Sequence, residues 1–366
     1  MKVYINGRFL CRRLTGVDRF AIETIKELNE LIAENHQSIK EIEYFIVVPH
    51  GAEINITFSH LKIIRFGFFK NQLWEQFSLP FLIFNKKAIL LNLCNTGPLI
   101  CRRQIVVIHD AAIKRVPETF SFRFRLWYGI LMPILGQFAK EIITVSQYSK
   151  HDLIDFFKIP NSKISVVGEG GEHIAKFNSD LDIFNRTNVR PNTYILAVSS
   201  HAPHKNFSLI ADALKNISKE CEVSFLIAGG TNPKIFSESI DMHSGKIKLL
   251  GYVSDNELKA LYSNALCFIF PSLYEGFGIP PLEAMNCSCP VLASNAASIP
   301  EVCGDAALYF SPTDSDKLAH LIEYVINNKK IRDELKIKGI ERAHIFSWRN
   351  TAIKVANSCN KVLRES

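Results

Sequence analysis

Strand-like and helix-like segments alternate in both halves of this 366-residue chain, and no other feature restricts its fold as strongly. Strands that alternate with helices form parallel, doubly wound sheets. The chain is too long for one ordinary core, so we expect two such domains. The predicted strands are residues 2–6, 43–49, 62–66, 88–93, 104–110, 141–146, 163–168, 194–200, 223–230, 246–253, 266–271, 290–295 and 306–312.

Between these two sets of segments, from 168 to 193, the sequence becomes polar and loop-like. We therefore predict an N-terminal domain over 1–170, a linker over 171–192, a C-terminal domain over 193–345 and a last helix over 346–366. No repeat of solenoid period and no low-complexity tract interrupts this order.

The net charge of +7 is a mild excess that suits a phosphate-bearing ligand or an anionic membrane face. No nucleic-acid-binding motif accompanies it, so we expect no nucleic-acid partner. The nine cysteines are scattered and lack zinc-site spacing, which favours reduced thiols. The N-terminus does not resemble a signal peptide, and the longest uncharged stretches are shorter than a membrane span. We expect a cytoplasmic protein.

The segment 271–290 carries two carboxylates, Glu275 and Glu283, around a turn with two glycines and two prolines. A buried strand precedes it and a helix follows, so we expect Glu275 in the loop and Glu283 in the first turn of the helix. Ligands of open α/β sheets bind at this carboxyl edge. A purely structural role for an acidic residue at a helix start is the alternative.

Lys205 lies in another loop between a strand and a helix, at residues 200–206. Such a loop directs cationic and backbone N–H donors at a phosphate, and a charged hydrogen bond contributes about 1.5–3 kcal/mol. A solvated surface lysine is the alternative. Gly16, between the first strand and helix, allows close backbone approach, although a plain turn glycine is an equal alternative. The chain lacks a G-x-G-x-x-G fingerprint, which argues against a dinucleotide oxidoreductase.

The sequence EGFGIPPLEAM at 275–285, followed by PVLASNAASIPEVCGDAALYF at 290–310, resembles the donor-site segment of retaining glycosyltransferases of family 4. The resemblance extends along nearly the whole chain. It implies the GT-B fold: two Rossmann-like domains with a cleft between them, and a C-terminal helix that crosses back to pack on the N-terminal domain.

The resemblance also assigns roles to individual residues. Glu283 is expected to accept the ribose hydroxyls of the nucleotide and Glu275 a sugar hydroxyl near the reacting carbon. Lys205 is expected to hold the diphosphate and to stabilise the leaving group, and His109 to contact the transferred sugar. Asp110 is expected to hold its loop or the imidazole rather than to take part in the chemistry. These three residues, His109, Glu275 and Lys205, are the predicted catalytic residues.

Further donor contacts follow from the same resemblance. The backbone N–H groups of Phe277, Gly278 and Ile279 are expected to meet the diphosphate or sugar, the loop at Tyr252 and Val253 the base, and Gly16 the phosphates. Gly229 and Gly230 are expected to allow close backbone approach near the base. Arg19 is expected to contact phosphate or acceptor. The chain departs from its relatives at the phosphate loop, because Ser199 and His204 stand where relatives often have arginine.

The opening sequence at 5–21 and the segment NQLWEQ at 71–76 resemble bacterial enzymes of O-antigen and capsule synthesis. They imply transfer of a hexose, such as mannose or rhamnose, from a nucleotide-diphosphate sugar to an oligosaccharide or lipid-linked acceptor, with retention. We expect no cofactor beyond the nucleotide sugar and no metal. The alternatives are a GT-B nucleotide-sugar epimerase and a non-catalytic nucleotide-sugar-binding partner of another transferase.

Two other interpretations of the acidic residues are weaker. Glycoside hydrolysis uses two acids that flank the bond, but here one loop holds both acids beside a phosphate loop. The triplet Asp180-Leu181-Asp182 resembles a metal-binding D-x-D, but it lies in the predicted linker and we expect it on the surface.

Aromatic and basic residues are interleaved in two stretches of the N-terminal half. They fit either the core or a peripheral contact with an anionic membrane, which are equal alternatives. The first stretch holds Phe58, Lys62, Arg65, Phe66, Phe68, Phe69, Lys70, Phe77, Phe81, Phe84, Lys86 and Lys87, and the second Arg115, Arg123, Arg125, Trp127 and Tyr128.

Overall fold

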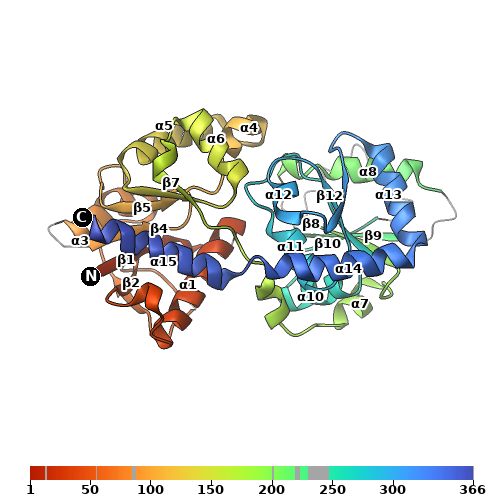
Figure 1. The fold of residues 1–366 in the computed structure, drawn as a ribbon, viewed down its shortest axis with the longest axis horizontal. Coiled ribbons are helices and arrows are strands. Elements are labelled where there is room, and N and C mark those ends of the chain that lie inside the picture. The colour runs from red at the N-terminus through yellow and green to blue at the C-terminus, as the bar shows by residue number, and fades with distance from the viewer. Residues whose placement is uncertain are drawn as a thin grey trace. The chain divides into compact units, whose positions relative to one another are not determined.

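The computed structural model describes residues 1–12, 15–54, 56–84, 88–199, 202–218, 223–229 and 247–365. The chain forms two compact units. Unit 1 consists of Met1–Glu169 and Trp348–Ser366, and unit 2 of Gly170–Ser347 (Figure 1).

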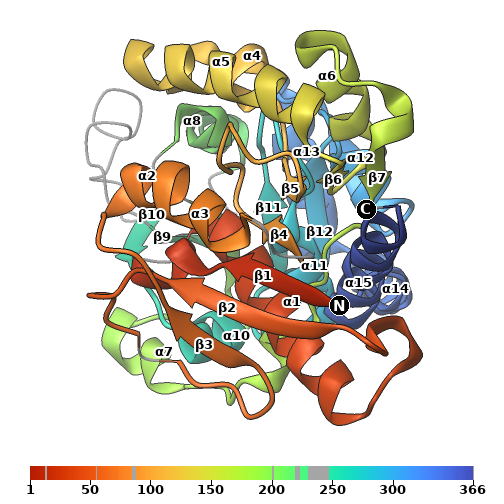
Figure 2. The ribbon, with the colours of Figure 1, turned by 90° about the vertical axis from the view of Figure 1, so that its left-hand side faces the viewer.

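Within the described residues, unit 1 is built on a parallel sheet of seven strands in the order β3-β2-β1-β4-β5-β6-β7. The direction of winding reverses between β1 and β4, which are hydrogen-bonded neighbours (Figure 2). Ligands of doubly wound sheets bind at such a switch point, beyond the carboxyl ends of the strands. The strands are β1 (Lys2–Asn6), β2 (Glu43–Val48), β3 (Lys62–Arg65), β4 (Ala88–Asn92), β5 (Gln104–Val107), β6 (Glu141–Thr144) and β7 (Ile164–Val166).

Helices cover both faces of this sheet. The helix α1 begins where the backbone N–H and the hydroxyl of Thr15 donate to the Asp18 carboxylate, at 3.0 and 2.7 Å, a capping arrangement typical of helix starts. The helices of unit 1 are η1 (Gly7–Cys11), α1 (Gly16–Ala33), η2 (Gln37–Ile39), α2 (Asn71–Leu73), η3 (Trp74–Ser78), α3 (Leu79–Ile83), α4 (Ala112–Arg115), η4 (Pro117–Thr119), α5 (Phe122–Phe138), α6 (Gln147–Phe157), η5 (Asn161–Lys163) and α15 (Trp348–Arg364).

The last helix, α15, confirms the predicted return of the chain to the N-terminal domain. It packs against α1, β4 and β6, and it lies beside α1 in the ribbon (Figure 1). Trp348 is fully buried, with its ring centroid 6.0 Å from that of Phe20. The Ser358 hydroxyl donates to the buried Glu141 carboxylate of β6 at 2.8 Å. Apolar burial and several polar contacts, among them the hydrogen bond from Thr351 to the carbonyl of Gly168, therefore fix this helix on unit 1.

Unit 2 repeats the same design. Its described strands are all parallel, in the order β10-β9-β8-β11-β12-β13, so its switch point lies between β8 and β11. The strands are β8 (Tyr194–Ser199), β9 (Ser224–Gly229), β10 (Ile247–Gly251), β11 (Cys267–Phe270), β12 (Val291–Ser294) and β13 (Ala307–Phe310). The helices are η6 (Glu172–Lys176), α7 (Asp182–Thr187), η7 (Pro203–Lys205), α8 (Phe207–Asn216), α10 (Asp255–Ser263), α11 (Ile279–Asn286), α12 (Ile299–Cys303), α13 (Ser315–Asn327) and α14 (Lys329–His344).

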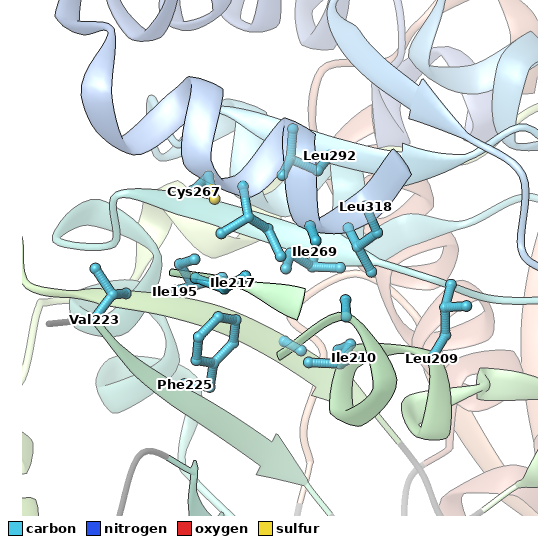
Figure 3. Packing of buried hydrophobic residues seen from close by; sticks show 14 of the residues in the cluster. Ile195, Leu209, Ile210, Ile217, Val223, Phe225, Cys267, Ile269, Leu292 and Leu318 are labelled. Carbon is cyan, nitrogen blue, oxygen red and sulfur yellow. The ribbon is translucent and has the colours of Figure 1, made fainter. Parts of the chain in front are cut away.

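An apolar cluster joins one face of this sheet to α8 and α13. Ile195, Phe225 and Ile269 from the strands pack with Ile210 and Leu318 from the helices (Figure 3). This burial holds the strands in place, so their carboxyl ends have fixed positions.

The predicted linker is wrong as a separate segment. Residues 171–192 belong to unit 2 and contain η6 and α7. A Cβ on Gly171 would lie 2.6 Å from the Cβ of Leu282, so the chain here packs directly on α11. The segment is polar because it is short and partly exposed, and polarity alone does not distinguish such a segment from a linker.

Candidate functional site

Lys205 and Glu275 meet at the switch point of unit 2. Lys205 follows β8 and Glu275 follows β11, and these two strands are neighbours. The Nζ of Lys205 lies 2.7 Å from Oε1 of Glu275, and both side chains are mostly buried. The predicted phosphate lysine and the predicted sugar carboxylate are therefore partners at the edge where α/β sheets bind ligands.

The loop that carries Glu275 is held by two polar side chains, the buried Ser298 and the partly buried Asn206. The Ser298 hydroxyl lies 2.9 Å from the carbonyl oxygens of both Glu275 and Phe277. The amide of Asn206 donates to the carbonyl of Pro271 at 3.1 Å. Gly278 ends the loop with φ +106°, a conformation that L-residues with a side chain rarely adopt. This glycine is therefore required by the backbone of the turn.

Glu283 lies deeper in the helix than the sequence suggests. The helix α11 begins at Ile279, directly after Gly278, so Glu283 is its fifth residue and not part of the first turn. Favourable interaction with the helix dipole is concentrated in the first turn, so it is not the main reason for a carboxylate here. Pro280 and Pro281 also lack N–H groups, which leaves Ile279 as the N–H donor among the first three helical residues.

Two side chains orient the buried Glu283 carboxylate. The Tyr262 hydroxyl donates to Oε2 at 3.0 Å, and Nε2 of His173 lies 3.0 Å from Oε1. Burial, together with the negative charge of Glu283, raises the pKa of Tyr262 well above its ordinary value. The phenol therefore stays neutral and keeps the proton that it donates.

The other residues that were predicted to contact the donor also lie in unit 2. Tyr252 is exposed over 75% of its surface, whereas Val253 is buried. The backbone N–H of Leu273 donates to the carbonyl of His204 at 2.8 Å, which joins the two loops at the switch point. Ser199 is the last residue of β8. Gly230, expected to allow close backbone approach, lies outside the described residues.

His109 is buried in unit 1, beyond the end of β5. Its Nδ1 lies 3.3 Å from the Glu169 carboxylate and its Nε2 lies 3.0 Å from the carbonyl oxygen of Leu93. Its ring makes an edge contact with Phe20 at 4.8 Å. Burial lowers the pKa of His109, but the hydrogen bond and charge of Glu169, with the Leu93 carbonyl, outweigh it and raise the pKa above its ordinary value. This pair of acceptors favours the imidazolium.

Gly16 and Arg19 lie at the start of α1. A Cβ on Gly16 would have no neighbour within 4 Å among the residues that the structure describes. Arg19 lies 3.6 Å from Glu23 on the same helix. Asp110, next to His109, accepts from the backbone N–H of Ala112 at 2.8 Å, and so it holds its loop as expected.

Sequence reasoning missed Glu169, His173 and Tyr262. Glu169 contacts His109 within unit 1, and His173 contacts Glu283 within unit 2. Both come from the sequence GEGGEH at 168–173, which was assigned to the domain boundary and linker. The sequence did carry a signal for these two residues, because ionisable side chains among glycines at a domain boundary are candidates for a functional site.

The described residues contain neither a metal-binding cluster nor a membrane-spanning helix. No group of three or more His, Cys, Asp or Glu side chains is arranged to hold a metal ion, and Asp180 and Asp182 are exposed as predicted. In the same part of the chain, every helix is too short or too polar to cross a bilayer.

Comparisons with known proteins agree with this geometry. Residues 180–342 match the family described as glycosyl transferases group 1. O-antigen chain mannosyltransferase B of Escherichia coli is 30% identical over 266 residues, which cover 70% of each chain. The serotype-specific mannosyltransferase WbdA of the same species is 29% identical over 66% of this chain, but the match spans only 31% of that longer protein.

Solved structures show the same fold. The Anabaena protein Alr3699/HepE, crystallised with UDP and glucose, superposes with a TM-score of 0.75 at 18% identity, over 99% of this chain and 100% of that one. The fold is therefore GT-B, as the sequence predicts. Three matches agree: the fold, the family segment at 180–342, and a relative that is similar along most of its length. The chain therefore belongs to the group 1 glycosyltransferases.

Proposed function

We propose that this glycosyltransferase moves a mannose, or a related hexose, from a nucleotide-diphosphate sugar to a saccharide acceptor in bacterial surface polysaccharide synthesis, with retention. The contact between Lys205 and Glu275 at the switch point of unit 2 carries the proposal, because it joins a cation for phosphate to an acceptor for sugar hydroxyls. The mannosyltransferase names of the relatives support the choice of sugar and pathway.

Lys205 is suited to hold a diphosphate without losing Glu275. An ammonium group has three donors, so one can remain on the Glu275 carboxylate while others meet phosphate oxygens. Charge that develops on the leaving diphosphate is then met by a cation already in position. Glu275 in turn keeps lone pairs for a sugar hydroxyl, because a carboxylate can accept about four hydrogen bonds.

Glu283 is suited to accept the two hydroxyls of a ribose. Tyr262 and His173 each contact a different carboxylate oxygen, so the group is fixed in orientation. A carboxylate that is already oriented loses little entropy when a ligand binds.

Two surfaces of unit 1 support a membrane-linked acceptor. Of the seven phenylalanines between 58 and 87, five are exposed, so the core interpretation fails for them; Phe58 and Phe66 are partly buried. We call the first surface the α2–α3 surface: Phe68, Phe69, Leu73, Phe77, Phe81 and Phe84, whose side chains are between 54% and 90% exposed. The exposed Lys62, Arg65 and Lys70 belong to the same stretch, whereas Lys86 and Lys87 lie outside the described residues.

The second surface is the first half of α5. Phe122, Leu126 and Ile130 are 75%, 55% and 50% exposed, and Arg123 and Arg125 are exposed between them. Large exposed apolar side chains beside cations suit the boundary of acyl chains and anionic headgroups. We propose that both surfaces contact an anionic membrane, where a lipid-linked acceptor would be found. In the second stretch Arg115 differs, because its guanidinium pairs with the buried Asp152.

A transfer assay tests the proposed activity. The purified chain is incubated with GDP-, UDP- and dTDP-hexoses, with and without a mannoside acceptor, and products are separated by mass. We expect one donor to give transfer only when acceptor is present, with the α-configuration of an α-linked donor kept in the product. A changed sugar from donor alone would indicate an epimerase, and no turnover of any donor would contradict the proposal.

A pair of lysine variants locates the activity. Lys205→Met should lower kcat/KM by about 10- to 150-fold, the equivalent of losing about 1.5–3 kcal/mol of charged hydrogen bonding. Lys215→Met is the matched control, because Lys215 is exposed on α8 and pairs with Asp212, whose side chain is half-exposed. Equal activity of the two variants would remove Lys205 from the site.

A further inference from the structure

The segment NQLWEQ folds in an unusual way that the donor site does not explain. Residues 74–78 form a π-helix, η3, between the short helices α2 and α3 (Figure 2). π-Helical turns are rare and frequently occur at functional sites. This turn buries two successive side chains, Trp74 and Glu75. The Trp74 indole donates to the carbonyl of Phe66 at 2.6 Å, which leaves Glu75 as the buried charge to be explained.

Glu75 lies at the centre of a polar network. Its Oε2 accepts from the Asn6 amide at 2.9 Å and from the Thr96 hydroxyl at 2.9 Å, and it lies 3.2 Å from Nε of Arg8. All three donors contact Oε2, so among the described residues Oε1 keeps its capacity to accept a hydrogen bond. A buried carboxylate costs stability unless it is fully paired, so this spare oxygen is notable.

The network lines a pocket at the switch point of unit 1. Its lining comes from the segments that follow β1 and β4, together with η3, and it has room for a group the size of one water molecule. A doubly wound sheet binds ligands at this position. The lining residues are Asn6, Arg8, Phe9, Arg12, Glu75, Leu93, Cys94 and Thr96.

Among the residues that the structure describes, the charges around this pocket balance. Arg8 pairs with Glu75, and Arg12 lies 2.5 Å from the buried carboxylate of Asp18. Burial raises the pKa of the Cys94 thiol well above its ordinary value, so this side chain is neutral. A site with equal positive and negative charge gives no net attraction to an anion or a cation. It does offer both donors and an acceptor, which is what a hydroxyl group requires.

Aromatic rings lie near the same network. Tyr128 of α5 is close enough to Arg8 and Glu75 for their charges to act on its hydroxyl. Its ring stacks on Phe124, with centroids 4.3 Å apart, and Phe124 stacks on Phe120 at 5.2 Å. Ligand sites combine such apolar faces with a few placed polar groups.

We infer that this pocket receives one hydroxyl group of the saccharide acceptor, and that Glu75, Arg8 and Thr96 select acceptors that carry it. The inference rests on the proposed function, because it assumes a saccharide acceptor. A site built to bond a hydroxyl discriminates strongly against the analogue that lacks it, since its buried polar groups are then left unpaired.

Saturation-transfer NMR with methyl α-D-mannopyranoside and its monodeoxy analogues, without donor, tests this. We expect the wild type to bind the parent mannoside and all analogues but one, which should bind at least about tenfold more weakly. Thr96→Val and Glu75→Gln should bind the parent and that analogue equally. Thr57→Val is the matched control, because Thr57 is exposed in the same unit.

The outcomes separate this inference from the proposed function. If no mannoside binds, if the wild type binds every analogue equally, or if Thr96→Val keeps the discrimination, the inference is wrong. Thr96→Val decides the matter should Glu75→Gln fail to fold. Thermal shifts with nucleotide sugars report the donor site separately and should be unchanged in these variants. If no nucleotide sugar shifts the melting temperature of the wild type, the proposed function is contradicted instead.

Discussion

His173 and Tyr262 contact different oxygens of the Glu283 carboxylate. The Nε2 atom of His173 lies 3.0 Å from Oε1, although His173 precedes Glu283 by 110 residues in the sequence. The second glutamate of the Glu-x7-Glu pattern is therefore held inside unit 2 by residues outside the pattern. The position of α11, the helix that carries Glu283, also depends on Gly171, whose backbone packs on Leu282 without room for a Cβ. Glu283 is thus oriented by packing as well as by hydrogen bonding.

Glu283→Ala should lower kcat/KM by about ten- to a hundred-fold, because a charged hydrogen bond to the nucleotide contributes about 1.5–3 kcal/mol. Tyr262→Phe should act on the same site more weakly, with donor KM raised about tenfold and acceptor KM unchanged. Steady-state kinetics on both variants measure these effects. Glu334→Gln on the exposed face of α14 serves as control. Unchanged kinetics in a folded Glu283→Ala protein would sink the ribose assignment.

The His109–Glu169 pair should make stability depend on pH. The pKa of His109 is raised in the folded protein above the value of about 6.5 expected when unfolded. The pair therefore contributes fully below about pH 6.5, and its contribution is lost as pH rises through the folded pKa. Urea unfolding at a series of pH values should show this decline in the wild type and not in His109→Gln.

The variant Glu169→Gln tests whether Glu169 is what raises the pKa of His109. Without the carboxylate, burial dominates and the pKa of His109 should fall below about 6.5, as followed by the NMR shift of its Cε1 proton. A pKa that stays raised in this variant would show that Glu169 is not responsible.

Gly278→Ala should destabilise unit 2 and weaken donor binding together. The residue has φ +106°, and a strained backbone of this kind costs about 1–3 kcal/mol. The new Cβ would also lie 3.4 Å from the Phe270 ring. Gly129→Ala, inside α5 with open space around it, should instead be neutral or stabilising by about 0.5–1 kcal/mol. Thermal unfolding with and without nucleotide sugar compares the two variants. Equal melting temperatures and equal ligand-induced shifts would show that the turn does not require glycine at 278.

Activity should persist in excess EDTA. The described residues contain no cluster of metal ligands, and Lys205 provides the cation that the proposal places on the diphosphate. The assay compares initial rates before and after chelation, with Mg²⁺ and Mn²⁺ added back. Loss of activity with EDTA and its recovery with either ion would contradict the phosphate site proposed here.

The protein should sediment with vesicles that contain phosphatidylglycerol at low salt and be released at high salt. Each cation near the anionic surface contributes about 1 kcal/mol, and salt screens it. Charge reversal at Arg123 and Arg125, or the double change Phe68→Ser and Phe81→Ser, should weaken binding without lowering the melting temperature, because these side chains are exposed. Ile337→Ser, at a 61% exposed position on α14, is the apolar control. Wild-type protein that stays in the supernatant at low salt would rule out the membrane contact.

The order of strands and helices could be predicted from the sequence, because it depends on local patterns. Runs such as 194–199 and 267–270 are apolar enough to require burial, and Gly278 and the two prolines after it mark a turn and a helix start without reference to any distant residue. The Glu-x7-Glu pattern is local in the same sense, so it gave both carboxylates and their family.

The partners of those carboxylates were decided by tertiary structure. Glu275 meets Lys205 across 70 residues because β8 and β11 are neighbours. His109 meets Glu169 across 60 residues because β5 and β7, the strands that precede them, are parallel and separated only by β6. Parallel crossovers bring together residues that no periodicity relates. The exposure of side chains was also decided by tertiary structure. Trp74 and Phe77 are both aromatic residues of η3, yet Trp74 is fully buried and Phe77 faces solvent. Only the packed sheet determines which side of a helix is covered.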